Sequence, residues 1–246
     1  MASTPAIPAA TLVMVRERVA QAPELLMVER AEGMAFAGGA LVFPGGRIDE
    51  SDRRMAGPEG SAAAVAAIRE TIEEAAIPVG LSPVPSAEAC LELQRDLLAD
   101  RAFDLLLQEY GLQLQLGALI PFARWVPKFH ATRRFDTLFY LARAPGPDWM
   151  PHVVEGECSG ALWISAAEAL EREQRGEARL IFPTRRNLER LAKHSSFDEM
   201  RADAEAHAIE PISPWVEEVE GENFITIPEG IGYPVTREKL DGLWRG

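Results

Sequence analysis

The sequence has few of the residues that build disulfide frameworks or histidine-based metal sites. Its 246 residues include two cysteines and four histidines. Cys90 and Cys158 stand far apart in the chain, which argues against a disulfide framework or a cysteine-ligated zinc and predicts two reduced thiols. His152, His194 and His207 lack the spacing of metal ligands, and no serine–histidine–acid arrangement stands out.

Long apolar runs are also missing. No stretch approaches the roughly 20 apolar residues that a membrane-spanning helix needs. Residues 1–10 lack the basic and apolar regions of a secretory signal, and the final Leu-Trp-Arg-Gly is not a peroxisomal address. We therefore expect a globular, cytoplasmic protein that has no membrane partner.

Basic residues are outnumbered by acidic ones. The chain has 25 Lys and Arg against 38 Asp and Glu, a net charge of −13. Nonspecific binding to nucleic acids or anionic membranes relies on a basic face, so neither partner is expected. An anionic small molecule remains possible as a ligand, because local arginines and a bound Mg²⁺ can reverse the field inside one pocket.

One segment has the organisation of a ligand site. A short apolar run over residues 40–43, typical of a strand, leads into Gly45 and Gly46, and a helical pattern follows over residues 61–76. Glycine permits positive φ and a close approach of the backbone to a ligand, and a carbonyl freed in such a turn can join a metal ion.

The predicted helix carries three acidic residues, Glu70, Glu73 and Glu74. At about 100° per residue their carboxylates lie on one side of the helix, away from its apolar stripe. Hard divalent cations favour such oxygens. The helix alone is also typical of a solvated surface, because Arg69 and Glu73 form an i,i+4 pair. The preceding glycine pair favours the metal site.

These residues together resemble the Nudix box, G-x5-E-x7-R-E-U-x-E-E-x-G-U, in which U is an aliphatic residue. The positions that match are Gly46, Arg69, Glu70, Glu73, Glu74 and Ile77. The positions that depart are Asp52 in place of the first glutamate, an insertion at residues 53–61, Thr71 at an aliphatic position and Ala76 at the late glycine. Glu50 or Glu59 could take the role of the first acid instead of Asp52.

A box insertion of this kind is similar to the coenzyme A diphosphatase branch of the Nudix hydrolases, and the segments 123–127 and 133–140 strengthen that similarity. The resemblance implies an α/β (α+β) fold, the Nudix α/β/α sandwich with a mixed sheet. We expect a single domain over residues 1–246, divided as follows: a core at about 10–192, an added helical segment at about 86–110 and a C-terminal extension at about 210–246.

Hydrophobic periodicity and turn residues locate the main elements. The predicted strands are 11–15, 24–28, 39–43, 112–126, 134–142 and 161–164. The predicted helices are 61–76 with Ser61 as its N-cap, 166–174 and 183–192, and residues 86–110 have a mostly helical pattern. The tail after residue 211 is expected to add strands to a sheet edge or to a dimer interface.

The resemblance also assigns roles. Mg²⁺, or Mn²⁺, would be held by Gly46, Glu70, Glu73 and Glu74. Glu73 is the chosen proton acceptor, although Nudix-like enzymes differ in which carboxylate serves, and Glu155 or Glu157 are candidates outside the box. Arg69 would orient neighbouring carboxylates, since its planar fork suits acid pairing. The catalytic set is therefore Glu73, Glu70, Glu74 and Arg69.

Substrate contacts are expected from the segment around residues 124–135. Arg133 and Arg134 are the first candidates for phosphate, followed by Arg124, and Phe135 could stack on adenine. The alternatives are a cationic strand edge that discourages aggregation and an aromatic core residue.

The resemblance implies a Mg²⁺-dependent diphosphatase that cleaves coenzyme A or acyl-coenzyme A to phosphopantetheine and adenosine 3′,5′-bisphosphate. One alternative is hydrolysis of ADP-ribose, NADH or another nucleoside diphosphate derivative. Another is a Nudix-fold binding module with little turnover. Each has an anionic nucleoside diphosphate as its small-molecule partner, and a homodimer is an expectation by resemblance.

Overall fold

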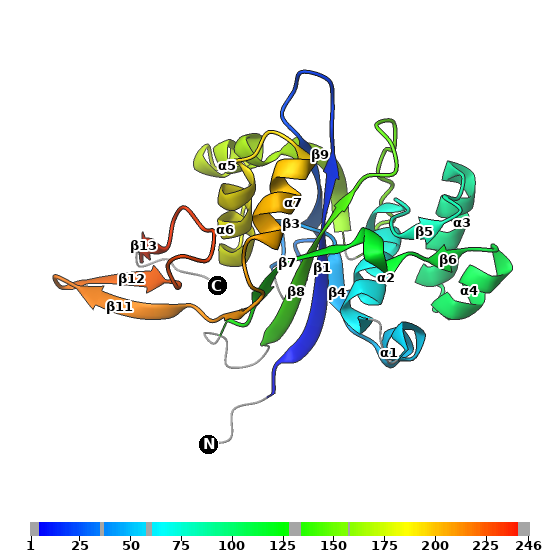
Figure 1. Ribbon diagram of the computed structural model, residues 1–246, viewed down its shortest axis with the longest axis horizontal. Helices are drawn as coiled ribbons and strands as arrows, with labels where there is room; N and C mark the ends of the chain where they lie inside the picture. Colours follow the sequence, from blue (N-terminus) through cyan, green and yellow to red (C-terminus); the bar gives the residue numbers. More distant parts are fainter. Residues whose placement is uncertain (1–4, 35–36, 58–60, 128–133, 157, 241–246) are drawn as a thin grey trace.

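A mixed eight-stranded sheet lies at the centre of the computed structural model, which describes residues 5–34, 37–57, 61–127, 134–156 and 158–240 (Figure 1). The strand order is β10-β7-β8-β1-β2-β3, with β4 paired to β1 and β9 paired to β2. The strands are β1 (Ile7–Arg16), β2 (Glu24–Arg30), β3 (Leu41–Val42), β4 (Gly45–Arg47), β7 (Ile120–Trp125), β8 (Phe135–Arg143), β9 (Cys158–Ser165) and β10 (Pro211–Ile212).

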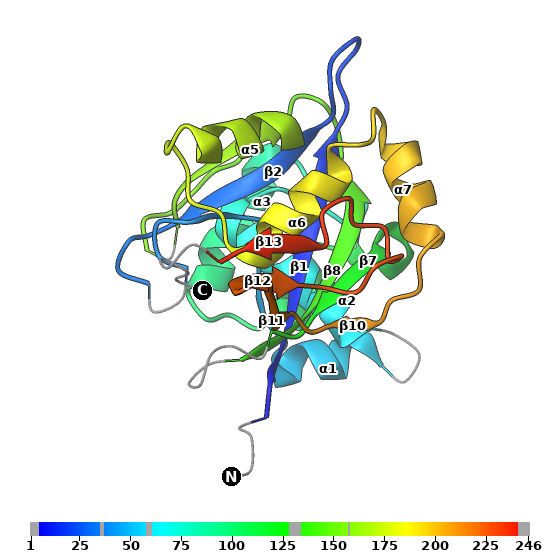
Figure 2. The same ribbon diagram turned by 90° about the vertical axis from the view of Figure 1, so that its left-hand side faces the viewer.

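Helices cover both faces of this sheet, which confirms the predicted α/β/α sandwich (Figures 1 and 2). The helices on one side are α1 (Glu50–Ala56), α2 (Ala62–Ala75), α3 (Ala87–Leu98) and α4 (Phe103–Glu109). Those on the other side are α5 (Ala166–Gln174), α6 (Phe182–Leu191) and α7 (Phe197–Glu205).

The central strand β1 explains why both faces are covered. It runs parallel to β8, with Ile7 opposite Phe135 and Val15 opposite Arg143. Successive side chains of a strand point to opposite faces. Leu12 therefore packs in the cluster under α2, and Val13 packs in the cluster under α6 and α7.

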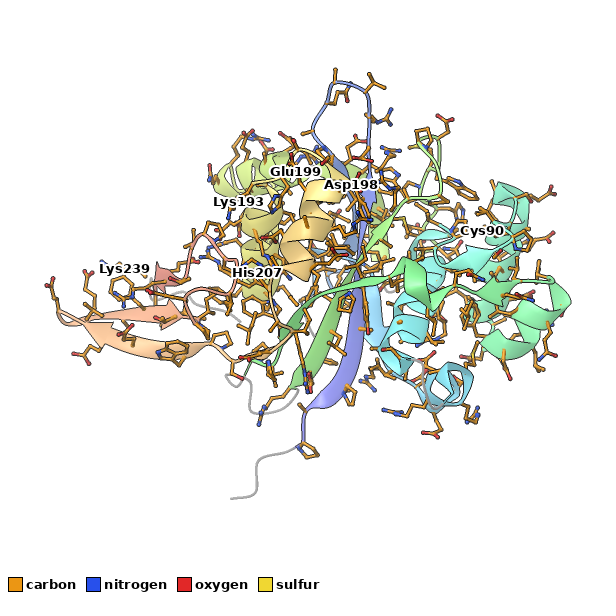
Figure 3. All side chains as sticks on the ribbon, in the orientation of Figure 1. Cys90, Lys193, Asp198, Glu199, His207 and Lys239 are labelled. Atoms are coloured by element: carbon orange, nitrogen blue, oxygen red, sulfur yellow. The ribbon has the colours of Figure 1, made fainter. Side chains whose placement is uncertain are left out.

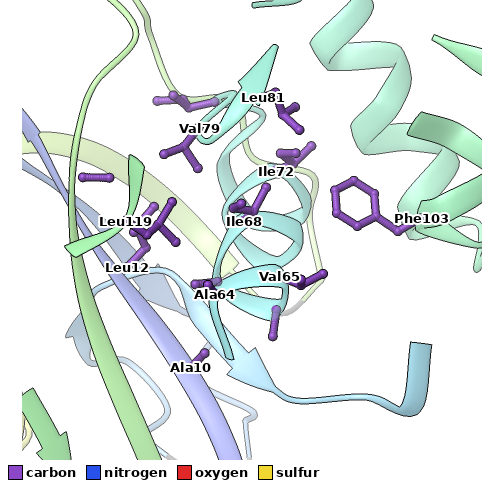
Figure 4. Packing of buried hydrophobic residues seen from close by; sticks show 14 of the residues in the cluster. Ala10, Leu12, Ala64, Val65, Ile68, Ile72, Val79, Leu81, Phe103 and Leu119 are labelled. Atoms are coloured by element: carbon purple, nitrogen blue, oxygen red, sulfur yellow. The ribbon is translucent and has the colours of Figure 1, made fainter. Parts of the chain in front are cut away.

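Helix α2 is held in place by its apolar stripe. Val65, Ile68 and Ile72 are fully buried between Leu12 of β1 and the α3–α4 layer (Figure 4). Ser61 caps the helix, since its hydroxyl accepts a hydrogen bond from the Ala64 N–H at 3.4 Å, as predicted. This packing fixes the direction in which the acidic side of α2 faces.

The predicted helical segment over residues 86–110 consists of two helices, α3 and α4. Asp100 has a φ of 58° and lies between them, and this left-handed conformation cannot continue a helix. Helices α1 and α7 were not predicted. Helix α1 takes up the first part of the supposed box insertion.

Two predicted strands are also shorter than expected. The pattern over residues 112–126 is broken into β6 (Gln113–Leu114), a 3₁₀ turn (Leu116–Ala118) and β7. Strand β6 pairs with β5 (Leu81–Ser82), away from the main sheet. The predicted strand over residues 39–43 is reduced to β3, and β4 follows after Pro44, whose carbonyl accepts the Leu12 N–H at 2.9 Å.

The tail adds strands, as predicted. Strand β10 extends the sheet beside β7, with Pro211 opposite Arg124. A separate three-stranded sheet follows, made of β11 (Trp215–Val219), β12 (Glu222–Thr226) and β13 (Arg237–Lys239). Tyr233 attaches this extension to α6, because its hydroxyl donates to Asn187 Oδ1 at 2.7 Å.

Both cysteines are buried, and no disulfide joins them. Figure 3 shows Cys90 in the α3–α4 layer, apart from Asp198 and Glu199 of α7 on the other side of the sheet. Burial raises the pKa of Cys90 to about 12. Of the helices in the described ranges, none has both the length and the apolar character needed to cross a membrane.

Candidate functional site

The site forms where the glycine turn meets α2. The Gly45 N–H donates to Glu74 Oε2 at 2.9 Å. A Cβ added at Gly46 would lie 2.4 Å from the Glu70 carboxylate, so this carboxylate occupies the space that a side chain would fill. A Cβ added at Gly45 would lie 2.3 Å from the Ala10 carbonyl oxygen. Close approach therefore requires glycine at both positions.

Arg69 connects the site to α1. Its Nε and Nη2 atoms donate to the two oxygens of Asp52 at 3.0 and 2.9 Å. Its Nη1 atom donates to Glu70 and to Glu73, each at 3.0 Å, and Nη2 also donates to the Arg47 carbonyl. Burial disfavours the charged guanidinium, but the hydrogen bond to Asp52 and the neighbouring carboxylates outweigh it and raise the pKa of Arg69. Through these contacts Arg69 joins Asp52 of α1 to Glu70 and Glu73 of α2.

Asp52, which stands at the first acidic position of the box, pairs with Arg69. It is fully buried, and besides Arg69 it accepts the Asp49 N–H at 2.8 Å. Glu50 is largely exposed and pairs with Arg53, whereas Glu59 lies outside the described residues. Helix α1 carries the shorter aspartate to Arg69, so the insertion that follows does not break the pairing.

The carboxylates on α2 are crowded and shielded from water. Burial is the largest cause that raises the pKa of Glu70, to about 8; the charges of Glu73 and Glu74 add to it, and Arg69 acts in the opposite direction. Burial also raises the pKa of Glu73. A divalent cation would relieve this repulsion, and the available donors, carboxylates and the Gly46 carbonyl, are the oxygen ligands that Mg²⁺ and Mn²⁺ accept.

The carboxylates are engaged with protein partners as they stand. Glu73 bonds to Arg69, and Glu74 bonds to Gly45 and lies 3.9 Å from Arg30 Nη1. Within the described ranges, no three His, Cys, Asp or Glu side chains converge as a metal-binding group. The fit to a hard cation lies in the oxygen chemistry of these donors and not in their present positions.

The other two departures from the box have distinct local consequences. Thr71 is fully buried, and its hydroxyl donates to the Ala67 carbonyl at 2.7 Å, so the polar atom is satisfied. Ala76 caps α2 with a φ of 51°, the left-handed conformation that glycine adopts without strain. A glycine at this position of the box would adopt the left-handed conformation without strain. Ala76 adopts the same conformation with a Cβ, which strains the backbone.

A cavity of about 650 Å³ opens beside this cluster. Glu70 and the Gly45–Gly46 turn form part of one wall, and Thr137 and Phe139 of β8 lie along the sheet. The first turn of α6 and the C-terminal extension also contribute to the lining. Its volume is in the range of small-molecule sites.

The predicted substrate residues are placed differently from one another. Arg134 and Phe135 line the cavity. Arg124 is directed to Asp136, with hydrogen bonds of 2.7 and 2.6 Å, and is absent from the described lining. Arg133 lies outside the described residues.

The candidate bases outside the box gain no support. The backbone of Glu155 bridges to Cys158, and Glu155 is not among the described residues that line the cavity. Glu157 lies outside the described residues.

Two cavity arginines were missed from the sequence, Arg30 and Arg47. Arg47 directly follows the glycine pair, and this position was a signal that could have identified it. Arg30 ends β2, distant in sequence from the box, and no local pattern sets it apart. The pairing of β2 with β3 and β9 brings it to the cavity.

Comparisons with known proteins concern the sequence and the fold as a whole. No family model matches the sequence. The structure is similar to that of a Nudix hydrolase from Alicyclobacillus acidocaldarius, with a TM-score of 0.72 and 31% identity, covering 82% of this chain and 97% of that chain.

Two curated relatives are more distant in sequence. Acyl-coenzyme A diphosphatase NUDT19 of Gallus gallus is 28% identical over 78% of this chain and 67% of its own length. Putative nudix hydrolase 7 of Caenorhabditis elegans is 25% identical over 82% of this chain and 66% of its own length. The chain thus spans about two thirds of these relatives.

Proposed function

The chain belongs to the Nudix hydrolase family, and from this premise we propose that its substrate is coenzyme A or an acyl-coenzyme A. Water would cleave the diphosphate bond and release phosphopantetheine, or its acyl derivative, and adenosine 3′,5′-bisphosphate. The observation that carries this choice is the similarity to a relative named acyl-coenzyme A diphosphatase over 78% of the chain.

The cavity supports a substrate of this kind. Its volume of about 650 Å³ suits an extended small molecule, and its described lining combines arginines with aromatic side chains. Arg30, Arg47 and Arg134 supply positive charge beside the carboxylate cluster. We assign these three cations to the phosphate groups, because guanidinium forks suit phosphate oxygens.

Glu70, Glu73, Glu74 and the Gly46 carbonyl would hold Mg²⁺ or Mn²⁺. When bound, the cation would neutralise diphosphate oxygens and lower the pKa of water. The protein's own part is to place these oxygens. Arg69 fixes Glu70 and Glu73 through its Nη1 atom, and the Gly45 N–H fixes Glu74.

Glu73 is the residue that we assign to proton transfer. Its Oε2 atom lies 3.0 Å from Arg69 Nη1, so the carboxylate is oriented by a permanent cation before any substrate arrives. Water losing its proton to Glu73 would attack one phosphorus, and the other phosphate would leave as a monoester.

Product analysis by mass spectrometry tests this proposal. Coenzyme A would be incubated with Mg²⁺ and wild-type protein, Glu73→Gln or Glu74→Gln, in water enriched in ¹⁸O. We expect phosphopantetheine and adenosine 3′,5′-bisphosphate from wild type, with both variants impaired and the label showing which phosphorus is attacked.

A panel of dephospho-coenzyme A, ADP-ribose and NADH serves as the comparison. Faster cleavage of ADP-ribose or NADH than of coenzyme A would replace the substrate assignment with a nucleoside diphosphate hydrolase. Absence of turnover across the panel, with ligand binding retained, would identify a binding module.

A further inference from the structure

The cavity has a wall that the catalytic cluster does not use. This α6 wall consists of Ile181, Phe182, Pro183 and Thr184 at the start of α6, together with Pro214 and Ile225 of the C-terminal extension. Helix α6 lies on the opposite side of the sheet from α2 (Figure 2). Ion pairs from Arg185 and Arg186 to Glu238 of β13 hold the extension against it.

The first turn of α6 offers unused hydrogen-bond donors. A helix leaves its first N–H groups without intrahelical partners, and no side chain caps this one, since Ile181 is at the N-cap. Pro183 has no N–H, and the Arg185 N–H donates to the Ile181 carbonyl at 3.0 Å. Within the described ranges, the N–H groups of Phe182 and Thr184 have no hydrogen-bond partner and are the donors left at this end.

The Thr184 hydroxyl is an independent sign of a ligand. Thr184 lines the cavity and is 2% exposed, yet no other described residue forms a hydrogen bond with its hydroxyl. Buried polar groups are nearly always paired. The other buried threonines follow this rule, since Thr71 donates to Ala67 and Thr226 donates to Glu217. The Thr184 hydroxyl is therefore available to donate a hydrogen bond to a molecule in the cavity.

The distribution of charge identifies the kind of molecule. In the described lining, the ionisable side chains are Arg30, Arg47, Asp49, Glu70 and Arg134. None of them belongs to the α6 wall, whose side chains other than Thr184 are apolar. The free N–H groups of a helix end can accept an anion or a carbonyl oxygen. The apolar side chains of the α6 wall favour the neutral amide carbonyl, which costs less to bring out of water than a phosphate.

We propose that the α6 wall binds the amide-bearing, uncharged arm of the substrate, with the Thr184 hydroxyl and the first-turn N–H groups donating to an amide carbonyl. This inference rests on the proposed function, in which the arm is pantetheine. The adenosine 3′,5′-bisphosphate half then lies with the arginines. Thr184 is a specificity-determining residue in this arrangement.

The two reaction products are separate probes for the two halves of the site. Calorimetry without metal would measure phosphopantetheine and adenosine 3′,5′-bisphosphate binding to wild type, Thr184→Val and Thr184→Ser. We expect Thr184→Val to weaken phosphopantetheine binding about 3- to 10-fold, the range of one neutral hydrogen bond, and to leave adenosine 3′,5′-bisphosphate binding unchanged. Thr184→Ser keeps the hydroxyl and should bind like wild type.

Thr226→Val is the matched control, because it removes a buried threonine hydroxyl of the C-terminal sheet that is not part of the described lining. It should leave the binding of both products unchanged. Unchanged phosphopantetheine binding in Thr184→Val, or an equal loss for both products, would overturn the inference. A loss confined to adenosine 3′,5′-bisphosphate would overturn it too and assign the α6 wall to the nucleotide half.

Wild-type activity separates the two proposals. If wild type hydrolyses coenzyme A while Thr184→Val binds phosphopantetheine normally, the inference fails and the proposed function stands. If wild type neither hydrolyses coenzyme A nor binds either product, the proposed function fails and the inference fails with it.

Discussion

Arg69 and Asp52 form a two-pronged ion pair, with both donor–acceptor distances close to 3 Å, between a fully buried carboxylate on α1 and a nearly buried guanidinium on α2. Both partners are away from water, so loss of the pair would leave buried hydrogen-bonding atoms without their partners. The same guanidinium orients Glu70 and Glu73, which joins the stability of α1 to the geometry of the site.

Replacing Asp52 by alanine should therefore affect both properties. The substitution leaves the Arg69 Nε donor buried without its partner, whereas Glu70 and Glu73 still balance the charge, so we expect a loss of about 1–3 kcal/mol of unfolding free energy. We expect hydrolysis to fall about 10-fold or more as well, because the carboxylates lose their support. Urea unfolding and initial rates measure the two effects. Glu50→Gln, on the exposed side of the same helix, should change stability by less than about 0.5 kcal/mol; an equal loss there would contradict the assignment.

Alanine substitutions at the two glycines of the turn should have different effects, one on activity and one on stability. In Gly46→Ala the new methyl group displaces the Glu70 carboxylate, so we expect a loss of activity of about 100-fold with a cooperative fold retained. In Gly45→Ala the new methyl group would clash with the backbone of β1. This backbone is fixed in the sheet, so the free energy of unfolding should fall by about 3 kcal/mol. Thermal unfolding beside activity distinguishes them, and an active Gly46→Ala enzyme would argue against a role for Glu70.

Ala76→Gly should stabilise the protein. Ala76 has a φ of 51°, and glycine removes the clash of the Cβ in this left-handed conformation, for a gain of about 0.5–1 kcal/mol. Ala75→Gly is the neighbouring control within α2, where glycine costs about 1 kcal/mol relative to alanine. Opposite shifts of the urea midpoint are expected. Shifts in the same direction would show that the conformation of Ala76 carries no strain.

Stability should depend on pH through Glu189. Burial is the largest cause that raises the pKa of this α6 carboxyl, to about 7, against the opposing charge of Arg186. A carboxyl with a raised pKa binds protons more tightly in the folded state, so its contribution to stability falls as pH rises from about 4.5 to about 7. Wild type should lose about 1–2 kcal/mol relative to Glu189→Gln over this interval, after allowance for solvent screening.

Chemical unfolding of both proteins at pH 4.5, 6 and 8 measures that difference. Other carboxylates titrate in both proteins, so they cancel in the comparison. A difference that does not change with pH would mean that Glu189 titrates like an exposed glutamate.

Local sequence was sufficient to predict the α2 side of the site. The apolar stripe, the Ser61 cap and the i,i+4 spacing all act within a few residues, so the helix and its row of carboxylates follow from short-range physical chemistry. The mixed α/β/α fold was predicted through the family resemblance. Helix boundaries near Asp100 were missed, because one left-handed residue interrupts a pattern that otherwise continues.

The rest of the site depends on contacts between distant segments. The packing of α1 beside α2 decides that Asp52, and not Glu50, pairs with Arg69. Arg124 forms an ion pair with Asp136 on the neighbouring strand and is absent from the described lining of the cavity. Arg30 and Thr184 reach the cavity only because the sheet and α6 assemble around it. The sequence by itself determined which chemical groups the catalytic helix presents, since periodicity places them. The tertiary structure alone decided which charges pair and which remain facing the cavity, because those pairings join residues that no local interaction brings together.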